Sequence, residues 1–539
     1  MLNAVMTYYS RLKVHRVSRS GIQDHRVDDI DHFRTHIELL HATGPRFTGS
    51  DAHGNYVTWL ETQLKDISNL EVFSEDVKVL GWQPKGSLEE SATLTILKDD
   101  GLDQPDRIAV AGSVPYTLPS TGRTGGMIYV PRHQKISGHE LKSKMILRDF
   151  PVHQLPYAVG MLPAYWMTSD MNDDLLDVYD RPGFADQIIH QDLLDAGNAQ
   201  VAGVLFMFDV PRDQVASYFE PHKGTHYHIP AAYVGVEESI VLKNAAMDVS
   251  TKTSATLSVK AKVTQRTAKA LKAVLPGQIE ERVIYVTHTD GNTCVQENGP
   301  VALLALARYF ATRSNSPGRR TIEFAFNVGH LHISREGSLA QAKELDASFD
   351  HVGDTTALVI PVEHLGTREI EAVHEQGEPG RRLCYTGRGE TMFWCVGPSP
   401  PVVQAVIAAV ARRRLDRVVV TRGVSIPRFN KTPVFTSFGG IGTYYHNLLL
   451  PTTSLISGPW SLWAPSFGPD AVDTCRLRQQ TLALGDVYDS LEMVSRQEII
   501  QGYVEYRKRR SLRGESWTIC EPPEKAEAVE TLESGAIQY

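Results

Sequence analysis

The chain has 539 residues, more than one compact core usually holds, and this length suggests two or three domains. Apolar residues make up 42% and charged residues 22% of the chain, as in ordinary globular proteins. The 63 acidic residues outnumber the 55 Lys and Arg, which gives a net charge of -8 at pH 7. Such a chain is not drawn to phosphate backbones or anionic lipid, so we expect neither nucleic acid nor a membrane as its partner.

The sequence shows no segment typical of export or membrane insertion. Its first residues are basic but lack the apolar stretch of a secretory signal, and no later run approaches about 18 consecutive apolar residues. The five cysteines are an odd number without Cys-x-x-Cys spacing, which argues against a disulfide framework and against a thiolate zinc site. We therefore expect the mature protein to be the whole chain, in a reducing cytoplasm.

The first hundred residues predict an arm followed by helices and strands. Residues 1–27 are polar and basic without a clear period, which is typical of a flexible arm. Asp31 is placed to cap the first helix. The elements expected next are helices at 32–41 and 52–64 and strands at 70–79 and 92–97.

A different pattern occupies residues 109–250. Short β-type runs are separated there by long irregular stretches rich in Pro, Gly and aromatic residues. The runs lie at 126–130, 145–148, 201–208 and 231–234. We expect a small inserted domain over this range. Its middle, 151–191, is too long and too aromatic for a passive connection, so it is a candidate cover for an active site.

Strands and helices alternate after residue 251, as in an α/β sheet protein. The expected strands are 257–263, 283–286, 322–326, 356–362 and 454–456, and the expected helices are 301–313 and 402–413. We predict one α/β domain made of 28–108 and 251–510. The remaining residues, 511–539, are acidic and predict a disordered tail.

Polar residues follow the strand near residue 285 in an order typical of an active site. The apolar strand ends in His288-Thr-Asp290, and a polar loop carrying Glu297 then leads into the helix at 301–313. An α/β hydrolase presents metal ligands in this way at the carboxyl end of a sheet. The sequence therefore predicts an enzyme.

Several segments, taken in order, resemble the zinc aminopeptidase and glutamate-carboxypeptidase superfamily, which are M28-like co-catalytic zinc exopeptidases. They are Gly44-Pro-Arg46 with Gly49-Ser50, His288-Thr-Asp290, Leu303 to Arg308, Gly337-Ser338 and Pro451 to Leu455. Residues 142–149, 202–206 and 229–230 resemble a protease-associated domain. The resemblance implies an α/β fold, a mixed sheet flanked by helices, with an inserted small β-rich protease-associated domain.

The chain departs from the family pattern at the metal ligands. The family has a metal-bridging Asp, then a Glu-Glu pair, a further carboxylate and a final His. Glu297 stands here at the bridging position and Glu363 at the later carboxylate. The segment 327–334 has no carboxylate where the Glu-Glu pair belongs, and the register puts either His330 or His332 there.

The resemblance implies zinc held by His288, Glu297, Glu363 and His446, the last being the nearest histidine to the family's final position. Zinc would polarise a carbonyl and lower the pKa of bound water toward ~7. Structural alternatives stand beside these roles. His288 could instead bond loop backbone at a strand end, and Glu297 could be a surface carboxylate attracted to a helix N-terminus.

Other residues are candidates for catalysis and for substrate binding. His330 could bind zinc, act as a general base with a pKa near 6.5, or be a core histidine bonded to a carbonyl. Asp290 would orient the site, and Tyr445 or Tyr444 could donate to a developing oxyanion. The substrate-binding candidates are Tyr444, Trp460 and His226, where Trp460 indicates an apolar or aromatic ligand and His226 belongs to a histidine-rich loop.

These observations lead to one main prediction and two alternatives. We predict a zinc-dependent hydrolase that acts on a peptide or amide-type bond of a small molecule or short peptide, with a homo-oligomer as one alternative for its assembly. Because both family glutamates are missing, the first alternative is a metal-independent tailoring enzyme of small-molecule metabolism. The second is a non-catalytic binding or scaffold protein on the same fold.

Overall fold

The computed structural model describes residues 21–98, 105–161, 163–183, 185–248, 252–313, 319–331, 336–351, 353–422 and 438–512. Most of the predicted arm, His332 and the tail beyond residue 512 lie outside these described residues. Residues 21–27, assigned by prediction to the arm, contain a short 3-10 helix at Asp24–Arg26. The backbone N–H of Ile22 donates to Asp486 at 2.8 Å, so this part of the chain is anchored to the main domain.

A five-stranded mixed sheet forms the centre of the main domain, in the order β1-β13-β15-β14-β16. Strand β14 (Ile279–His288) lies between β15 (Arg320–Asn327) and β16 (Thr356–Pro361) and runs parallel to both. Strands β1 (Glu71–Pro84) and β13 (Ala261–Leu275) add a long antiparallel pair. The carboxyl-terminal halves of the three parallel strands are buried and largely apolar, as strands covered on both faces should be.

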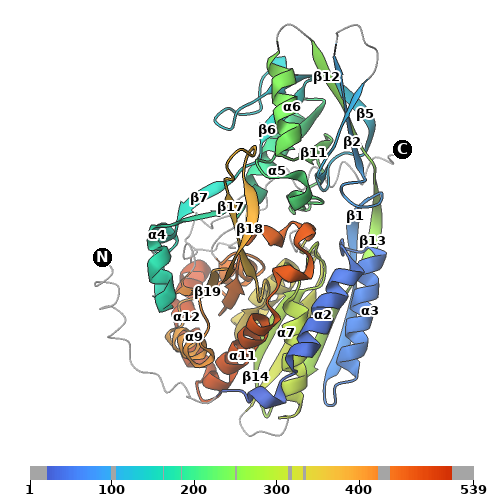
Figure 1. Ribbon diagram of the computed structural model, residues 1–539. Helices are drawn as coiled ribbons and strands as arrows, with labels where there is room; N and C mark the ends of the chain where they lie inside the picture. The colour runs from blue at the N-terminus through green and yellow to red at the C-terminus, as the bar shows by residue number, and fades with distance from the viewer. Residues whose placement is uncertain are drawn as a thin grey trace.

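Helices cover both faces of this sheet (Figure 1). Alternate side chains of β14 point to opposite faces, so Val283 and Tyr285 join one apolar cluster while Ile284 and Val286 join another. The first face packs against α2 (Ile30–Thr43), α3 (Asp51–Lys65), α7 (Gly299–Ala311) and α11 (Thr474–Leu491). The second packs against α8 (Ser338–Phe349), α10 (Gly442–Asn447) and α12 (Arg496–Leu512). The predicted α/β class with helices flanking a mixed sheet is confirmed.

The N-terminal ends of the first two long helices are capped by side chains. Asp29 accepts from the backbone N–H of His32 and caps α2, and Ser50 accepts from that of His53 and caps α3. The prediction that Asp31 is the cap was wrong, because the helix begins two residues earlier and Asp31 lies in its first turn. There the carboxylate interacts favourably with the helix dipole.

A second sheet of eight strands has the order β3-β2-β12-β5-β6-β10-β11-β4 (Figure 1). Its strands are β2 (Ala92–Lys98), β3 (Asp106–Ile108), β4 (Gly112–Ser113), β5 (Ser120–Tyr129), β6 (Met145–Asp149), β10 (Gly203–Met207), β11 (Ala231–Val234) and β12 (Thr253–Val259). Helices α5 (Ala185–Asn198) and α6 (Val236–Met247) belong to the same layer. Because β2 and β12 pair with each other, this layer extends past both predicted limits, 109 and 250.

The aromatic middle of the predicted insert packs on the main domain. Strand β8 (Ala164–Met167) pairs antiparallel with β20 (Val418–Thr421), which completes a four-stranded sheet with β19 (Met392–Val396) and β21 (Thr453–Ile456). Beside β8 lie the two-stranded antiparallel sheet of β7 (His153–Pro156) and β9 (Val178–Arg181), the short helix α4 (Tyr157–Gly160) and the 3-10 helix η3 (Ser169–Leu176). Helix α9 (Pro400–Arg413) packs on the same sheet.

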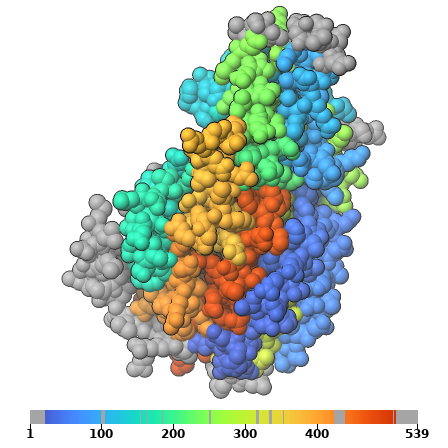
Figure 2. Space-filling view, in the orientation of Figure 1, coloured from blue at the N-terminus to red at the C-terminus, as the bar shows by residue number. Residues whose placement is uncertain are grey.

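A β-hairpin links the main domain to the layer of the eight-stranded sheet. Strands β17 (Arg368–Val373) and β18 (Arg382–Gly389) rise from the main domain, and in Figure 2 their orange surface reaches the green helix α6. Arg381 donates to Asp209 at 2.7 Å, and Gln214 exchanges hydrogen bonds with the backbone of Leu383. Within the described ranges, no helix combines the length and apolar character needed to cross a membrane.

Candidate active site

Three buried side chains meet at the carboxyl edge of the central sheet. His288 closes β14, His330 follows β15 and Glu363 follows β16. One ligand atom from each of them lies within 4.8 Å of the other two. Because the three strands are parallel neighbours, their carboxyl ends reach the same edge, and this topology brings the residues together. We call these three residues the strand-end cluster.

Backbone carbonyls determine which ring nitrogen of two histidines carries the proton. Nδ1 of His288 lies 2.8 Å from the carbonyl oxygen of Asp290, and Nδ1 of His364 lies 2.8 Å from that of Ser457. A carbonyl only accepts, so Nδ1 is the donor in both rings, and in a neutral ring Nε2 then carries a lone pair. The two Nε2 atoms lie 3.5 Å and 3.8 Å from the same carboxylate oxygen, Oε2 of Glu363.

Three lone-pair atoms therefore face one another inside the protein. Among the described residues, Nε2 of His288, Nε2 of His364 and Oε2 of Glu363 have no hydrogen-bond partner, and neither does Nδ1 of His330. Buried acceptors that converge without a donor are unfavourable unless a cation or proton lies between them. Imidazole nitrogen and carboxylate oxygen are ligands that zinc prefers, so the residues present fit this metal.

The other oxygen of Glu363 is held by a glycine turn. Oε1 accepts from the backbone N–H of Ile441 at 2.9 Å. Gly440, directly before it, has a φ of 45°, and a β-carbon added there would overlap this carboxylate. Burial alone would raise the pKa of Glu363, but interactions with His288 and His364 in their protonated forms and with the backbone N–H of Ile441 outweigh it, so the pKa is lowered. The carboxylate is thus ionised and directed at the histidines.

The histidines of the site are in the form that binds metals. Burial lowers the pKa of His330 far below its ordinary value, and the neighbouring His288, His222 and His364 act in the same direction. Burial also lowers the pKa of His364, although Glu363 opposes this. Both rings are consequently neutral at pH 7. The rings of His288 and His330 stack at 3.9 Å with an interplanar angle of 16°.

Asp290 positions the segment that carries His330. Its carboxylate accepts from the backbone N–H groups of His330 at 3.2 Å and Leu331 at 3.0 Å, and from the hydroxyl of Thr48 at 2.7 Å. Burial would raise the pKa of Asp290, but His53, His288 and these hydrogen bonds lower it. Because both oxygens already accept hydrogen bonds, Asp290 acts through the backbone it holds.

Glu297 has a partner within the chain. It forms an ion pair with Arg46, and both side chains are buried, with exposed fractions of 0% and 1%. Arg46 also donates to the carbonyl oxygens of Leu40, at 2.6 Å, and Thr293, at 3.2 Å. Glu297 is not one of the residues that bring a ligand atom to the strand-end cluster.

The three candidates on α10 lie in other surroundings. The ring of His446 stacks on Phe438 at 3.9 Å, and burial lowers the pKa of His446 to about 3. The hydroxyl of Tyr445 donates to Gln341 at 2.7 Å, and Tyr444 packs in the apolar cluster of the second sheet face. None of the three belongs to the strand-end cluster.

The other two substrate-binding candidates are buried in structural contacts. Trp460 is fully buried and donates from its ring nitrogen to the carbonyl oxygen of Asp180 at 3.2 Å. His226 lies 3.3 Å from the carbonyl oxygen of Leu80, and burial lowers its pKa to about 4. Trp463 and His222, which are close to these two residues in sequence, lie next to His330.

His222 and Trp463 flank the strand-end cluster on the side of the second layer. The ring of His222 lies 5.1 Å from that of His330 and 4.5 Å from that of Trp463. His364, His222 and Trp463 are thus neighbours of the site that were not selected as site residues from the sequence. Their signals were present, because His364 follows Glu363, His222 opens the histidine-rich loop and Trp463 follows the last core strand. Nothing in the sequence ranked them above His226 and Trp460.

A second group could also be considered for a metal. Ligand atoms of Asp186, Glu220 and His222 lie within 4.8 Å of one another. The ammonium group of Lys223 pairs with Asp186, however, and Nδ1 of His222 lies 2.9 Å from the same carboxylate. Burial lowers the pKa of Lys223, while Asp186 opposes this change. An internal cation therefore already balances this group.

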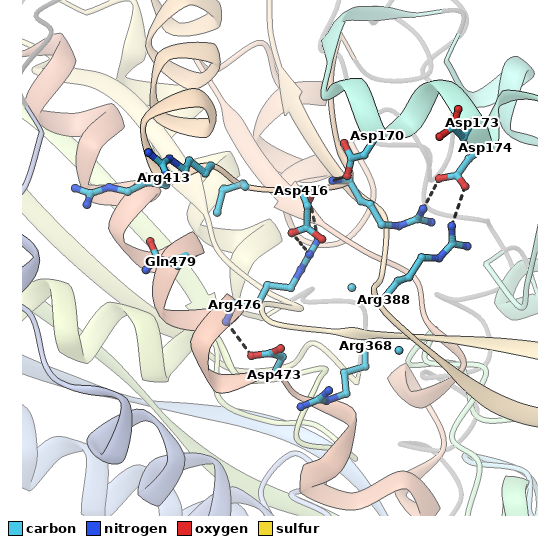
Figure 3. Close-up of a pocket in the computed structure, with 15 residues that line it drawn as sticks. Asp170, Asp173, Asp174, Arg368, Arg388, Arg413, Asp416, Asp473, Arg476 and Gln479 are labelled. Atoms are coloured by element: carbon cyan, nitrogen blue, oxygen red, sulfur yellow. Dashed lines mark hydrogen bonds and ion pairs between the residues drawn. The ribbon is translucent and has the colours of Figure 1, made fainter.

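A pocket of about 510 Å³ lies apart from the strand-end cluster (Figure 3). Its lining is rich in Arg and Asp and contains neither His nor Cys. Its charged groups are largely paired with one another: Arg388 lies 3.0 Å from Asp174, and Arg476 pairs with Asp416. These ion pairs join the β17–β18 hairpin to η3 and α11 to the loop before β20, so the pocket has a structural explanation.

Comparison with known proteins supports the fold. No protein-family model and no curated protein matches the sequence. Among solved structures, a zinc aminopeptidase from Bacillus subtilis has a TM-score of 0.56 at 14% identity, covering 86% of this chain and 95% of that one. An aminopeptidase from Aneurinibacillus sp. strain AM-1 has a TM-score of 0.53 at 15% identity, with the same coverage.

A peptidase M28 precursor from Shewanella amazonensis SB2B has a TM-score of 0.56 at 15% identity, covering 92% of this chain and 97% of that one. Likeness at such identities concerns the fold and leaves the activity open. That the inserted segment is a protease-associated domain stays a prediction. The chain has the fold of the zinc aminopeptidases and M28 peptidases, as its motifs predicted.

Proposed function

We propose that the protein is a zinc-dependent hydrolase that cleaves a peptide or amide-type bond of a small substrate. The observation that carries this proposal is the convergence of buried lone pairs on Glu363, His288 and His364, with the ring of His330 stacked beside them. Zinc bound there would polarise a substrate carbonyl and increase the acidity of a bound water. The aminopeptidases of the same fold give the substrate class, a peptide or amide bond.

The residues of the chain have separate roles in this proposal. His288, His330 and Glu363 would hold the metal, and Asp290 would keep the His330 segment in place through two backbone hydrogen bonds. Nε2 of His364, which no ligand role requires, is placed to accept a proton from water near Glu363. This assignment gives His330 a ligand role in place of the general-base role considered from the sequence.

The substrate would approach from the side of the second layer. His222 and Trp463 lie there, next to His330, and keep exposed fractions of 8% and 6%. The strand-end residues behind them are less exposed, with His288 and Glu363 at 0%. An aromatic ring at such an entrance favours substrates with an apolar or aromatic side chain. We expect turnover to depend on the size and polarity of that side chain.

The test combines metal analysis with turnover of a panel of aminoacyl anilides. Protein purified without chelator or affinity nickel should contain zinc by plasma mass spectrometry and should release the aniline. His288→Ala should lose both properties, with turnover lowered at least about 100-fold. His446→Gln is the matched control and should retain both, because His446 lies outside the strand-end cluster. Metal-free protein with no turnover would refute the proposal and favour metal-independent chemistry or ligand binding.

A further inference from the structure

The carboxylates around the strand-end cluster differ in how they are neutralised. Glu363 has an oxygen without a hydrogen-bond partner among the described residues and faces two lone-pair nitrogens. Asp290 has its oxygens occupied by backbone N–H groups and the hydroxyl of Thr48. Glu297 is paired with the guanidinium of Arg46. Glu297 also has oxygens without a hydrogen-bond partner among the described residues, but it is paired with an arginine, whereas Glu363 faces histidine nitrogens.

Hydrogen bonds with backbone groups hold Arg46 next to Glu297. Its own backbone N–H donates to the carbonyl oxygen of Gly291 at 2.8 Å, and the N–H of Gly291 donates back at 3.1 Å. These two reciprocal hydrogen bonds join the segment around Arg46 to the turn directly after Asp290. The side chain also donates to carbonyl oxygens of Leu40 and Thr293, so its direction is fixed independently of Glu297.

Arg46 and Glu297 thus form a site in which the cation is a side chain. A guanidinium stays protonated at neutral pH and satisfies a carboxylate through directional hydrogen bonds. A divalent ion on Glu297 would have to displace a buried guanidinium whose other hydrogen bonds hold it in place. Displacement would leave two cations together beside Asp290, and their repulsion is strong in a buried region.

We propose that Arg46 takes the place of a second metal ion, so that the protein binds one divalent ion per chain at the strand-end cluster. This inference rests on the proposed function and deepens it in two ways. It sets the number of metal ions at one, and it assigns the positive charge next to Glu297 to Arg46. The guanidinium of Arg46 and the carboxylate of Glu297 then remain paired with each other, and the single metal ion binds at the strand-end cluster.

The stoichiometry of zinc tests this inference. Protein exposed to excess zinc and desalted should contain one equivalent by plasma mass spectrometry. Arg46→Ala should contain two, because Glu297 becomes available, and Arg46→Ala/Glu297→Gln should return to one. Arg46→Lys, which keeps a cation, should also contain one. A second equivalent retained by the unchanged protein would overturn the inference and leave the proposed hydrolase standing, whereas no zinc at all would overturn both.

A second measurement covers the case in which Arg46→Ala does not fold. The unchanged protein is titrated with cobalt(II), and the electron paramagnetic resonance signal is followed with each equivalent. One metal site predicts an isolated high-spin signal that reaches full intensity at one equivalent and keeps its shape beyond it. Loss of this signal between one and two equivalents, as coupled ions produce, would overturn the role given to Arg46.

Discussion

Removing the carboxylate of Glu297 should destabilise the protein strongly while leaving the strand-end cluster chemically unchanged. In Glu297→Gln the side chain keeps its size and its ability to accept hydrogen bonds, but Arg46 becomes a buried cation without a counter-charge. The exposed fraction of Arg46 is 1%, so water cannot take over the role of the carboxylate. The variant therefore isolates the electrostatic contribution of the pair.

The magnitude follows from the burial of Arg46. Burial lowers the pKa of Arg46 from 12.5 to about 10, while Tyr56, Cys294 and Asp290 act in the opposite direction. That difference, about 3 kcal/mol, is a cost of burying the charged form that the unchanged protein already carries, and it does not measure the loss of Glu297. Breaking a buried ion pair by removing one partner costs about 3–5 kcal/mol in general. We therefore expect Glu297→Gln to lower the free energy of unfolding by about 3–5 kcal/mol.

The assay is guanidinium unfolding in the presence of a chelator, so that metal binding does not contribute. Arg46→Met and the double variant Arg46→Met/Glu297→Gln complete the cycle. Each single variant leaves one buried charge unpaired, whereas the double variant leaves none. It should thus be more stable than Glu297→Gln by about 2 kcal/mol or more. A loss below about 1 kcal/mol in Glu297→Gln would refute the buried pair, because such values are typical of exposed ion pairs.

Three further predictions concern the site and the pH dependence of stability. Zinc content should fall to zero in His288→Ala and remain at the level of the unchanged protein in His446→Gln, measured by plasma mass spectrometry. Gly440→Ala should weaken zinc binding at least about 10-fold in a chelator competition, since the new β-carbon overlaps the carboxylate of Glu363; unchanged affinity would contradict this packing. Burial raises the pKa of Asp489 from 3.8 to about 6, so the folded state binds its proton more tightly, and stability should fall by up to about 3 kcal/mol as pH rises through this interval. Asp489→Asn should remove this loss in urea unfolding at pH 4 and pH 7, and an identical pH slope in both proteins would contradict the assignment.

The parts of the fold that the sequence predicts well are those specified by local pattern. The strands at 283–286, 322–326 and 356–362 are largely apolar, with Glu323 as the charged exception, and such runs are typical of strands buried on both faces of a parallel sheet. The limits of the second layer were not predictable in this way. Its edge is set by the pairing of β2 with β12, whose residues lie about 160 positions apart, and no local pattern specifies such a partner.

The same distinction explains the pairing of β8. Its four residues pair with β20, more than 200 positions away, and both strands are too short to show a period. The aromatic segment was therefore expected as a cover for the active site from its composition alone. The structure gives its aromatic and apolar residues a packing role beside the four-stranded sheet.

The residues of the candidate site also differ in how well the sequence predicts their positions. His288 and Glu363 end strands whose parallel order puts them at one edge, so two independent constraints, burial of the strand and its direction, fix where they lie. Glu297 and His446 follow from counting along loops, where each inserted residue changes the position. Glu297 is paired with Arg46, about 250 positions earlier in the chain, and His446 lies on a short helix that directs it at Phe438.

A bound metal ion is consequently inferred from the residues at the strand ends, and the complete family ligand set is not required. Nδ1 of His288 and Nδ1 of His364 each lie next to a backbone carbonyl, so in the neutral rings Nε2 presents a lone pair toward Glu363. A set of acceptors that faces inward in this way requires a positive partner. Arg46 supplies one for Glu297, but no described side chain supplies one for Glu363, and a bound ion is the simplest way to complete the site.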